Sequence, residues 1–249
     1  MLAKMLIKEI LKTFPINKTE AEIILADLLG KDRSFLHAYP EFNLTRPQEH
    51  RYIELLRRRE SNEPLAYILG HKEFYGREFY VDRRVLIPRT ETEDLVDQII
   101  SYIKSNYSIK RLIKIADVGT GSGCIAITLA RLLPNAKIYA TDIDQSALEV
   151  AKKNAKYHQV EDKIIFLEGD LLSPLSESVD IIVANLPYIK SAVIKKLDPQ
   201  ISKWEPKIAL DGGADGLALY RVLFKQAEKV LKPNGMIFYE LDGNVFNFY

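Results

Sequence analysis

The spacing of apolar residues changes along the chain. Up to about residue 63 they recur every three or four positions, which predicts amphipathic helices. From residue 111 onward, short apolar runs alternate with helical patterns, which predicts a parallel sheet covered by helices on both faces. The expected strands are 112–118, 138–141, 164–167, 179–184 and 236–241, and the expected helices between them are 124–133, 145–158 and 217–231. We therefore expect an α/β fold with a small N-terminal helical bundle.

Start and stop signals divide the chain into three expected segments. Thr19 begins a capping-box pattern in the helical part, and Thr90 begins a second one before the sheet. Thr45 is expected to start another helix, with Pro47 in its first turn. The stretches 74–76 and 79–81 are typical of two short strands around a glycine turn, which predicts a hairpin. The expected segments are a helical domain at 1–63, a linker with a short β-hairpin at 64–89, and the sheet domain at 90–249.

Composition limits the classes of function. The formal net charge of +1 gives no overall field that would attract nucleic acid or a membrane, and no apolar run approaches the roughly 20 residues of a membrane span. Cys124 is the single cysteine, which excludes an internal disulfide and favours a reducing compartment. The four histidines lack the spacing of metal ligands, so we expect no metal site. These features predict a cytoplasmic protein, with a monomer as the default.

Two charge clusters have simple structural interpretations. Arg57–Arg59 could contact RNA or an acidic partner, but a helix end in solvent is the favoured interpretation. Glu91, Glu93 and Asp94 lie in one turn, where negative charge is stabilised by the dipole at the start of a helix. We therefore assign neither cluster to the chemistry.

A glycine-rich loop follows the first expected strand. Dinucleotide-binding loops place their third glycine where this chain has Cys124, so NAD is disfavoured. Alternating glycines let the backbone approach a small zwitterionic tail, and Asp142 after the second strand can bind the two hydroxyls of a ribose. The combination resembles the S-adenosylmethionine site of Rossmann-like methyltransferases, with NAD or a turn without a ligand as alternatives. The residues expected at this cofactor are Asp117, Gly119, Thr120, Gly121, Ser122, Gly123, Asp142 and Leu171.

The segment Asn185-Leu186-Pro187-Tyr188 follows the fourth strand, where open α/β sheets place their chemistry. The Asn185 side-chain oxygen can accept a hydrogen bond from an NH2 group, its own NH2 can donate one, and the Leu186 carbonyl is a second acceptor. Pro187 restricts the backbone on both sides, and Tyr188 adds a flat face for a planar group. The segment therefore predicts a binding site for the NH2 group of a planar amide or an amino-purine. The alternative is a turn that only ends a strand.

The two sites together predict methyl transfer to nitrogen. An amide nitrogen is a poor nucleophile because its lone pair is delocalised into the carbonyl. Two acceptors that hold its hydrogens would direct the lone pair toward a sulfonium methyl group, and a closed site would strengthen those hydrogen bonds. Because the proton can leave after transfer, no strong general base is required.

Several stretches carry a narrower resemblance. They are 63–70, 73–76, 86–93, 204–206, 209–210 and 213–217. In this order they resemble the release factor glutamine methyltransferases, which methylate the glutamine of the Gly-Gly-Gln motif in peptide chain release factors and so act in translation termination. The resemblance covers about Lys8 to Asp242. It implies S-adenosyl-L-methionine as cofactor, S-adenosyl-L-homocysteine as product, and a helical domain that docks the release factor. It also implies cofactor contacts at Gly119 to Gly123, Asp142, Leu171 and Asn185, and a glutamine held by Asn185 to Tyr188.

The chain departs from the family in two places. The family has proline where this chain has Leu186, and the acceptor there is a backbone carbonyl that any residue supplies. The family also adds a two-stranded hairpin after the strand 236–241, for which residues 242–249 are too short. We therefore expect that strand to lack a neighbour and to leave apolar surface at Phe246, Phe248 and Tyr249 exposed.

Two alternatives stay open. Asn-Leu-Pro-Tyr also occurs in rRNA adenine dimethyltransferases, so an adenine amino group of RNA or DNA is the first alternative substrate. A non-catalytic protein that binds the cofactor and docks release factors is the second. The near-neutral charge and the motifs outside the core favour the glutamine methyltransferase, for which no direct nucleic-acid or membrane partner is expected.

Overall fold

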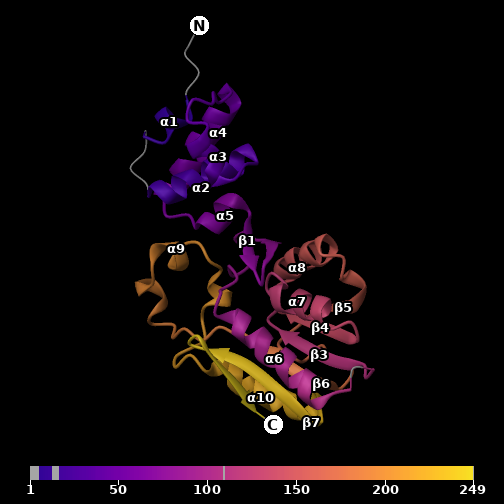
Figure 1. Ribbon diagram of the computed structural model, residues 1–249. Helices are drawn as coiled ribbons and strands as arrows, with labels where there is room; N and C mark the ends of the chain where they lie inside the picture. Colours follow the sequence, from indigo (N-terminus) through magenta and orange to yellow (C-terminus); the bar gives the residue numbers. More distant parts are fainter. Residues whose placement is uncertain (1–5, 13–16, 109, 249) are drawn as a thin grey trace. The chain divides into compact units, whose positions relative to one another are not determined.

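The computed structural model describes residues 6–12, 17–108 and 110–248 (Figure 1). Contacts between residues group the chain into two compact units. One unit contains the helices up to Gly70 together with residues 199–204, and the other contains residues 71–198 and 205–249. Within the described part, no helix has the length and apolar character needed to cross a membrane.

The first unit is a bundle of short helices around an apolar core. Its helices are α1 (Ile7–Ile10), α2 (Lys18–Leu29), α3 (Arg33–Ala38), α4 (Arg46–Glu60), α5 (Leu65–Leu69) and α9 (Pro199–Ser202). Helical spacing places Ile24, Tyr52 and Leu56 in the core, where each is 0% exposed. The Tyr52 hydroxyl donates a hydrogen bond to the Ala21 carbonyl at 3.0 Å, which joins α4 to α2. The predicted helical character of this part is confirmed.

The starts of two helices in this unit show how caps are chosen. Helix α4 starts where the sequence predicts, and Thr45 caps it in a capping box with Gln48. The cap of α2 is Asn17, whose side-chain oxygen accepts the N–H of Thr19 at 2.8 Å. The prediction that Thr19 itself opens this helix was wrong because asparagine two residues earlier satisfies the free N–H groups.

The arginine cluster at the end of α4 stabilises the unit from within. Arg58 donates to both carboxylate oxygens of Glu63, at 2.8 and 2.6 Å. Arg59 makes the same two-point contact with Glu20, at 2.8 and 2.9 Å. Two of the three guanidinium groups are therefore held by carboxylates of this unit, while Arg57 is exposed.

The second unit is built on a six-stranded sheet. Its strands are β3 (Ile113–Val118), β4 (Ala136–Asp142), β5 (Ile164–Glu168), β6 (Val179–Ala184), β7 (Leu231–Leu241) and β8 (Asn244–Phe248). The strand order is β5-β4-β3-β6-β7-β8, and every pair is parallel except β7 with β8. The order reverses between β3 and β6, and such a reversal places a crevice at the carboxyl ends of these strands.

Helices cover both faces of this sheet (Figure 1). They are α6 (Thr92–Asn106), α7 (Cys124–Leu132), α8 (Gln145–Tyr157) and α10 (Ala218–Val230). Successive strand residues point to opposite faces, so Ile115 packs with α6 and α7, whereas Ala116 packs with α10. The three remaining short helices are 3₁₀ turns at Glu161–Lys163, Ile194–Lys196 and Lys207–Ala209. The predicted α/β methyltransferase architecture is confirmed.

The segment before the sheet forms the predicted hairpin with different limits. Its strands are β1 (His71–Phe74) and β2 (Arg77–Tyr80), which start earlier than the strands 74–76 and 79–81 expected from sequence. The following helix α6 starts at Thr92 and has no side-chain cap, so the capping box expected at Thr90 was wrong. The Glu93 carboxylate instead accepts the N–H of Tyr75 at 2.9 Å, which ties the helix start to the hairpin.

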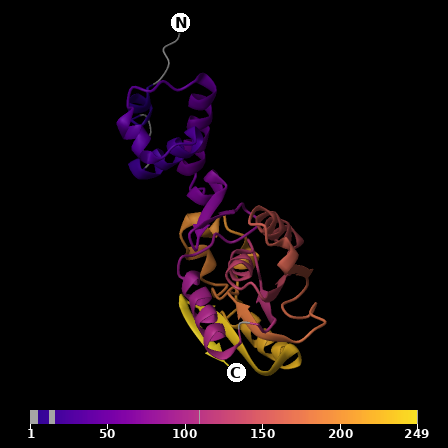
Figure 2. The same cartoon turned by 45° about the vertical axis from the view of Figure 1, so that its right-hand side comes forward.

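The last strands correct one expectation about the sheet edge. A turn at Asp242 and Gly243, both with positive φ, reverses the chain after β7. Strand β8 then pairs antiparallel with β7 from Leu241–Asn244 to Ile237–Phe248 (Figure 2). The expectation that β7 lacks a neighbour was therefore wrong, because a tight turn leaves enough residues for one strand. Phe246 and Phe248 are exposed at 42% and 58%, as expected, and Tyr249 lies outside the described residues.

Candidate active site

A cavity of about 500 Å³ opens at the carboxyl ends of the parallel strands, at the reversal of strand order. Segments that follow β3, β4, β5 and β6 contribute to its wall. The predicted site residues in this wall are Gly119, Gly121, Asp142, Leu171, Asn185, Leu186 and Pro187. The structure thus brings the glycine loop and the Asn-Leu-Pro-Tyr segment to one cavity.

The glycine loop is held in a conformation that requires glycine. Gly119, Gly121 and Gly123 have φ values of 72°, 53° and 80°. The N–H groups of Gly119 and Thr120 both donate to the Thr141 carbonyl at 2.9 Å, which fixes the loop to the end of β4. A Cβ atom on Gly119 would lie 3.0 Å from Leu186 Cδ2. Glycine therefore lets the loop contact the segment after β6.

Asp142 ends β4 and presents its carboxylate to the cavity. Oδ2 accepts the N–H of Gly121 at 2.9 Å, and Oδ1 accepts the N–H of Asp144 at 3.0 Å. Burial raises the pKa of this carboxyl, and the backbone hydrogen bonds act in the opposite direction. Because each carboxylate oxygen has two lone pairs, both can still accept a hydrogen bond from a ligand.

Four predicted cofactor residues do not line the cavity: Asp117 in β3, and Thr120, Ser122 and Gly123 within the loop. Asp117 Oδ2 accepts the Thr120 hydroxyl at 2.7 Å and the N–H of Ala126 at 3.1 Å. The Asp117 side chain is 1% exposed, and burial raises its pKa to about 6. In this position Asp117 joins the loop to the first turn of α7.

The cavity wall fits an adenosyl group that ends in a charged amino-acid tail. The glycine loop leaves bare backbone facing the cavity, and Asp142 keeps acceptor capacity for a ribose diol. Leu171, 8% exposed, supplies apolar surface after β5 next to Asp170. Within the described ranges, no group of three histidine, cysteine or acidic residues could hold a metal ion.

Asn185 is oriented by two partners that sequence analysis missed. Its Nδ2 donates to the Thr92 hydroxyl at 3.0 Å and to Glu240 Oε2 at 3.0 Å. Both hydrogens of the amide NH2 are therefore used inside the protein, so this group does not donate to a substrate. The Oδ1 atom is the polar end left for the cavity, and its role as an acceptor for a substrate NH2 stays a prediction.

The backbone of Leu186 is fixed by Tyr220, another residue that sequence analysis missed. The Tyr220 hydroxyl accepts the Leu186 N–H at 3.2 Å and donates to the Glu240 carbonyl at 2.5 Å. The Leu186 carbonyl lies 3.2 Å from the same hydroxyl. Because a hydroxyl has one hydrogen and the Glu240 carbonyl is nearer, the Leu186 carbonyl keeps acceptor capacity.

Pro187 and Tyr188 lie against a glycine-rich loop at residues 212–216. This loop belongs to the insertion between β6 and α10. The Gly212 N–H donates to the Ile189 carbonyl at 2.9 Å. A Cβ atom on Gly212 would lie 2.7 Å from the Pro187 oxygen, and one on Gly216 would lie 2.3 Å from the Tyr188 oxygen. The insertion therefore supports the backbone of the Asn-Leu-Pro-Tyr segment, and its two glycines are required for this close approach. Tyr188 is half-buried and does not line the cavity.

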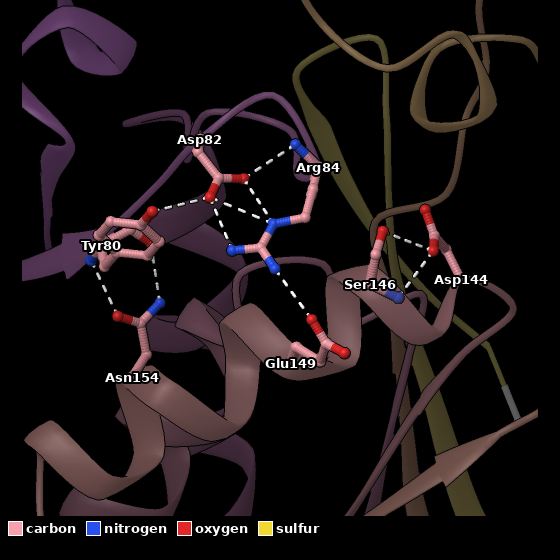
Figure 3. Close-up of polar contacts among 7 residues, drawn as sticks. All are labelled: Tyr80, Asp82, Arg84, Asp144, Ser146, Glu149 and Asn154. Carbon is pink, nitrogen blue, oxygen red and sulfur yellow. Dashed lines mark hydrogen bonds and ion pairs between the residues drawn. The ribbon is translucent and has the colours of Figure 1, made fainter.

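The segment after β2 also lines the cavity. Its polar contacts with α8 are shown in Figure 3. Arg84, which lines the cavity, donates to both Asp82 oxygens and to Glu149 on α8 at 3.0 Å. Burial alone would raise the pKa of Asp82, but the hydrogen bonds from Arg84 and Tyr80 outweigh it and lower the pKa to about 2. These contacts hold the segment on α8 beside Asp142.

The residues missed from sequence carried different signals. Glu240 is one acidic residue within the apolar strand 236–241, a pattern that could have marked it. Thr92 lies within the capping-box pattern expected from Thr90, and no local pattern indicates its contact with a residue 93 positions later. Arg84 lies in a run of charged residues with no distinguishing pattern.

Comparisons with known proteins identify similar families and relatives. Residues 6–70 match the family model of the PrmC N-terminal domain, and residues 98–212 match the model of the ribosomal protein L11 methyltransferase (PrmA). The release factor glutamine methyltransferase of Koribacter versatilis is 40% identical over 229 residues, which cover 91% of this chain and 80% of the relative. That of Bacillus anthracis is 38% identical over 228 residues, covering 90% and 80%. A solved methyltransferase from Pyrococcus furiosus matches with a TM-score of 0.47 and 18% identity, covering 76% of this chain and 79% of that structure.

Proposed function

Because the chain belongs to the release factor glutamine methyltransferases, which depend on S-adenosylmethionine, we propose that it methylates the side-chain amide of the glutamine in the Gly-Gly-Gln motif of a peptide chain release factor. The observation that carries this proposal is the orientation of Asn185. Its NH2 is held by Thr92 and Glu240, so its oxygen is left for a ligand in the cavity. A site with an acceptor at this place suits a substrate that brings hydrogen-bond donors.

The chain's own residues bind and orient the amide. Asn185 Oδ1 and the Leu186 carbonyl each accept one N–H of the glutamine NH2, which holds the nitrogen in one position. With both hydrogens held, the nitrogen lone pair is directed toward the glycine loop. When bound there, S-adenosylmethionine supplies an electrophilic methyl group. The amide nitrogen loses its surplus proton after the transfer. This nitrogen is a weak acid before it is methylated and a strong acid afterwards, so the proposed mechanism needs no strong general base.

The helical domain expected at residues 1–63 is proposed to dock the release factor. The match to the PrmC N-terminal domain supports a family-specific role for this part of the chain. Its surface exposes two aromatic side chains, Tyr39 at 58% and Phe42 at 41%. Exposed aromatic groups are enriched at protein interfaces because they bury large area with few rotatable bonds.

The test is transfer of a labelled methyl group from S-adenosylmethionine to purified release factor. The wild-type enzyme should label the natural factor and not a factor whose motif glutamine is replaced by alanine. Asn185→Ala should reduce labelling by at least about 100-fold while cofactor binding changes less, because it removes the acceptor that orients the amide. Asn247→Ala is the matched control, since Asn247 is exposed on β8 and outside the cavity wall.

Other outcomes would replace the proposal. Label on RNA or DNA instead of protein would identify the adenine methyltransferase. Binding of cofactor and release factor without any transfer would identify the non-catalytic docking protein. Activity of Asn185→Ala near the wild-type level would show that the acceptor has been assigned to the wrong residue.

A further inference from the structure

Asn185, in the cavity wall, is hydrogen-bonded to two side chains that do not line the cavity. Asn185 Nδ2 donates to Thr92 Oγ1 and to Glu240 Oε2, both at 3.0 Å. The Thr92 hydroxyl also acts on Glu240, where it lowers the pKa of the carboxyl. The three side chains come from the segment after β6, from the start of α6 and from β7. Thr92 is 3% exposed and Glu240 is 2% exposed, so water does not compete for these bonds.

The carboxylate determines the direction of every bond in this set. Burial raises the pKa of Glu240, and its contacts with Thr92 and Asn185 act in the opposite direction. An ionised glutamate can only accept, so the Thr92 hydroxyl gives its hydrogen toward Glu240. The Thr92 oxygen then has only lone pairs to offer to Asn185. Both neighbours of the amide are therefore acceptors, and Asn185 must turn its NH2 toward them and its oxygen away. A flipped amide would place its oxygen against two oxygen atoms and lose both bonds.

We propose that Glu240, acting with Thr92, is a positioning residue that makes the cavity select a glutamine amide over a glutamate carboxylate. This rests on the proposed function, because it takes the glutamine side chain as the substrate group. With its oxygen facing the cavity, Asn185 attracts an NH2 and repels a carboxylate oxygen. The selectivity of the site is thus set by a carboxylate that does not line the cavity.

Glu240→Gln is the discriminating variant because it keeps the shape of the side chain and removes its charge. A glutamine at this position can offer either an oxygen or an NH2 group. Asn185 can then adopt both amide orientations, and in one of them it presents NH2 to the cavity. The variant should bind the glutamine substrate more weakly and the glutamate analogue more strongly than the wild type does.

The measurement is the ratio of two dissociation constants. Release factor carrying either glutamine or glutamate in its motif is titrated into the enzyme loaded with S-adenosylhomocysteine. Contacts made outside the cavity contribute equally to both dissociation constants, so they do not affect the ratio. The wild type should prefer the glutamine form by about 10- to 100-fold, the range expected for hydrogen bonds that involve a charged group. In Glu240→Gln the preference should fall by at least about tenfold, and kcat for methylation should fall with it.

Matched variants separate orientation from folding. Thr92→Ser keeps the hydroxyl and should keep the wild-type preference, whereas Thr92→Val removes it and should reduce the preference. Glu228→Gln, on the exposed face of α10, should change neither binding constant. Equal weakening of both forms in Glu240→Gln, or an unchanged ratio, would overturn the proposal and leave Glu240 with a purely structural role.

A second readout does not depend on the release factor. In protein with ¹⁵N-labelled asparagine, the Asn185 NH2 signal is identified by its loss in Asn185→Asp, and its exchange with solvent is measured. Exchange should be slow in the wild type and in Thr92→Ser, and at least about tenfold faster in Glu240→Gln. Fast exchange in the wild type would overturn the inference. If the wild type methylates no release factor, the proposed function fails, and this exchange measurement still decides the role of Glu240.

Discussion

At the scale of single residues, Gly216 makes the closest approach to the proposed amide-binding segment. It has φ of 85°, and a Cβ atom there would lie 2.3 Å from the Tyr188 oxygen. Gly216→Ala therefore combines backbone strain with a steric clash and should lower the free energy of unfolding by about 2 to 4 kcal/mol. Relief of the clash moves the Pro187–Tyr188 backbone, so methylation should fall by more than cofactor binding does. Urea unfolding and the labelled-methyl assay measure the two effects.

Gly243→Ala is the control for this prediction. Gly243 has a similar φ of 72°, but a Cβ atom there would meet nothing within 4 Å. The variant should show the strain alone, about 1 kcal/mol, with the KM for release factor unchanged. Equal loss of activity in both variants would show that general destabilisation, and not contact with Tyr188, lowers methylation.

Cys124 illustrates a residue whose burial removes its reactivity. It lies at the start of α7, is 9% exposed, and burial raises the pKa of its thiol to about 12. Because the thiolate is the reactive form, native protein at pH 8 should react with a disulfide reagent at least about 100-fold more slowly than unfolded protein. The thiol titration gives one reactive group per chain only after unfolding, and rapid reaction of the native protein would contradict this assignment.

The sequence reveals a site residue when a local pattern marks it. Asn185 was predicted because it follows a buried strand, and the structure places it in the cavity wall. Asp117 was also predicted, yet it lies behind the loop, because spacing alone does not tell which of two acidic strand ends faces the ligand. Glu240 and Tyr220 act through contacts across the sheet, and no local pattern contains such contacts.

At the scale of elements, one buried carboxylate joins three segments at the amino ends of the strands. Asp180 in β6 is 1% exposed and accepts the N–H of Lys114 at 2.8 Å, Arg111 at 2.6 Å and Lys232 at 2.9 Å. Asp180→Asn should lower the free energy of unfolding at pH 7 by about 1 to 3 kcal/mol, since the bonds to cations lose their charged partner. Urea unfolding measures the difference.

The pH dependence of this difference has a defined sign. Burial alone would raise the pKa of Asp180, but the hydrogen bond from Lys114 and the charges of Lys232 and Arg111 lower it. The stabilisation is therefore present above the pKa of an unfolded aspartate, about 3.9, and is lost as pH falls through the lower folded value. The stabilities of wild type and Asp180→Asn should begin to converge below about pH 4 and become equal only below the lower folded pKa. Asp162 is exposed, so Asp162→Asn should differ little from the wild type in its free energy of unfolding at any pH. This variant should therefore show no such convergence.

Elements were predicted in kind more reliably than in extent. The alternation of strands and helices comes from hydrophobic periodicity, which is local, so the parallel core was found. Strand β7 begins at Leu231, five residues before the expected start, because Leu231 pairs with Val179 ahead of an irregularity in register. Strand β8 was missed because its pairing depends on the turn at Gly243 and not on its own weak pattern.

At the scale of the whole molecule, chain order does not determine which segments form a unit. Residues 199–204 follow the Asn-Leu-Pro-Tyr segment in sequence, yet their contacts group them with the N-terminal helices. This grouping depends on contacts between residues far apart in the sequence. It cannot be predicted locally, because a stretch of six residues is too short to show a periodicity that indicates its partner. The helical character of the first 63 residues, in contrast, follows from local spacing alone.

The proposed docking role of the helical unit predicts a division of labour between binding and chemistry. Phe35 supports Tyr39 and Phe42, with ring centroids 4.8 and 5.4 Å away, so the two exposed rings form one patch. Replacing Tyr39 and Phe42 together by alanine should raise the KM for release factor by about tenfold, the effect of losing roughly 1.4 kcal/mol of interface energy. Cofactor affinity and the kcat at saturating release factor should not change, because the cavity belongs to the other unit.

Tyr157→Ala is the control, since Tyr157 is 66% exposed on α8 and its replacement should leave KM unaltered. An equal rise in KM for a short Gly-Gly-Gln peptide would contradict docking, because such a peptide cannot reach a second surface and would report damage to the site itself.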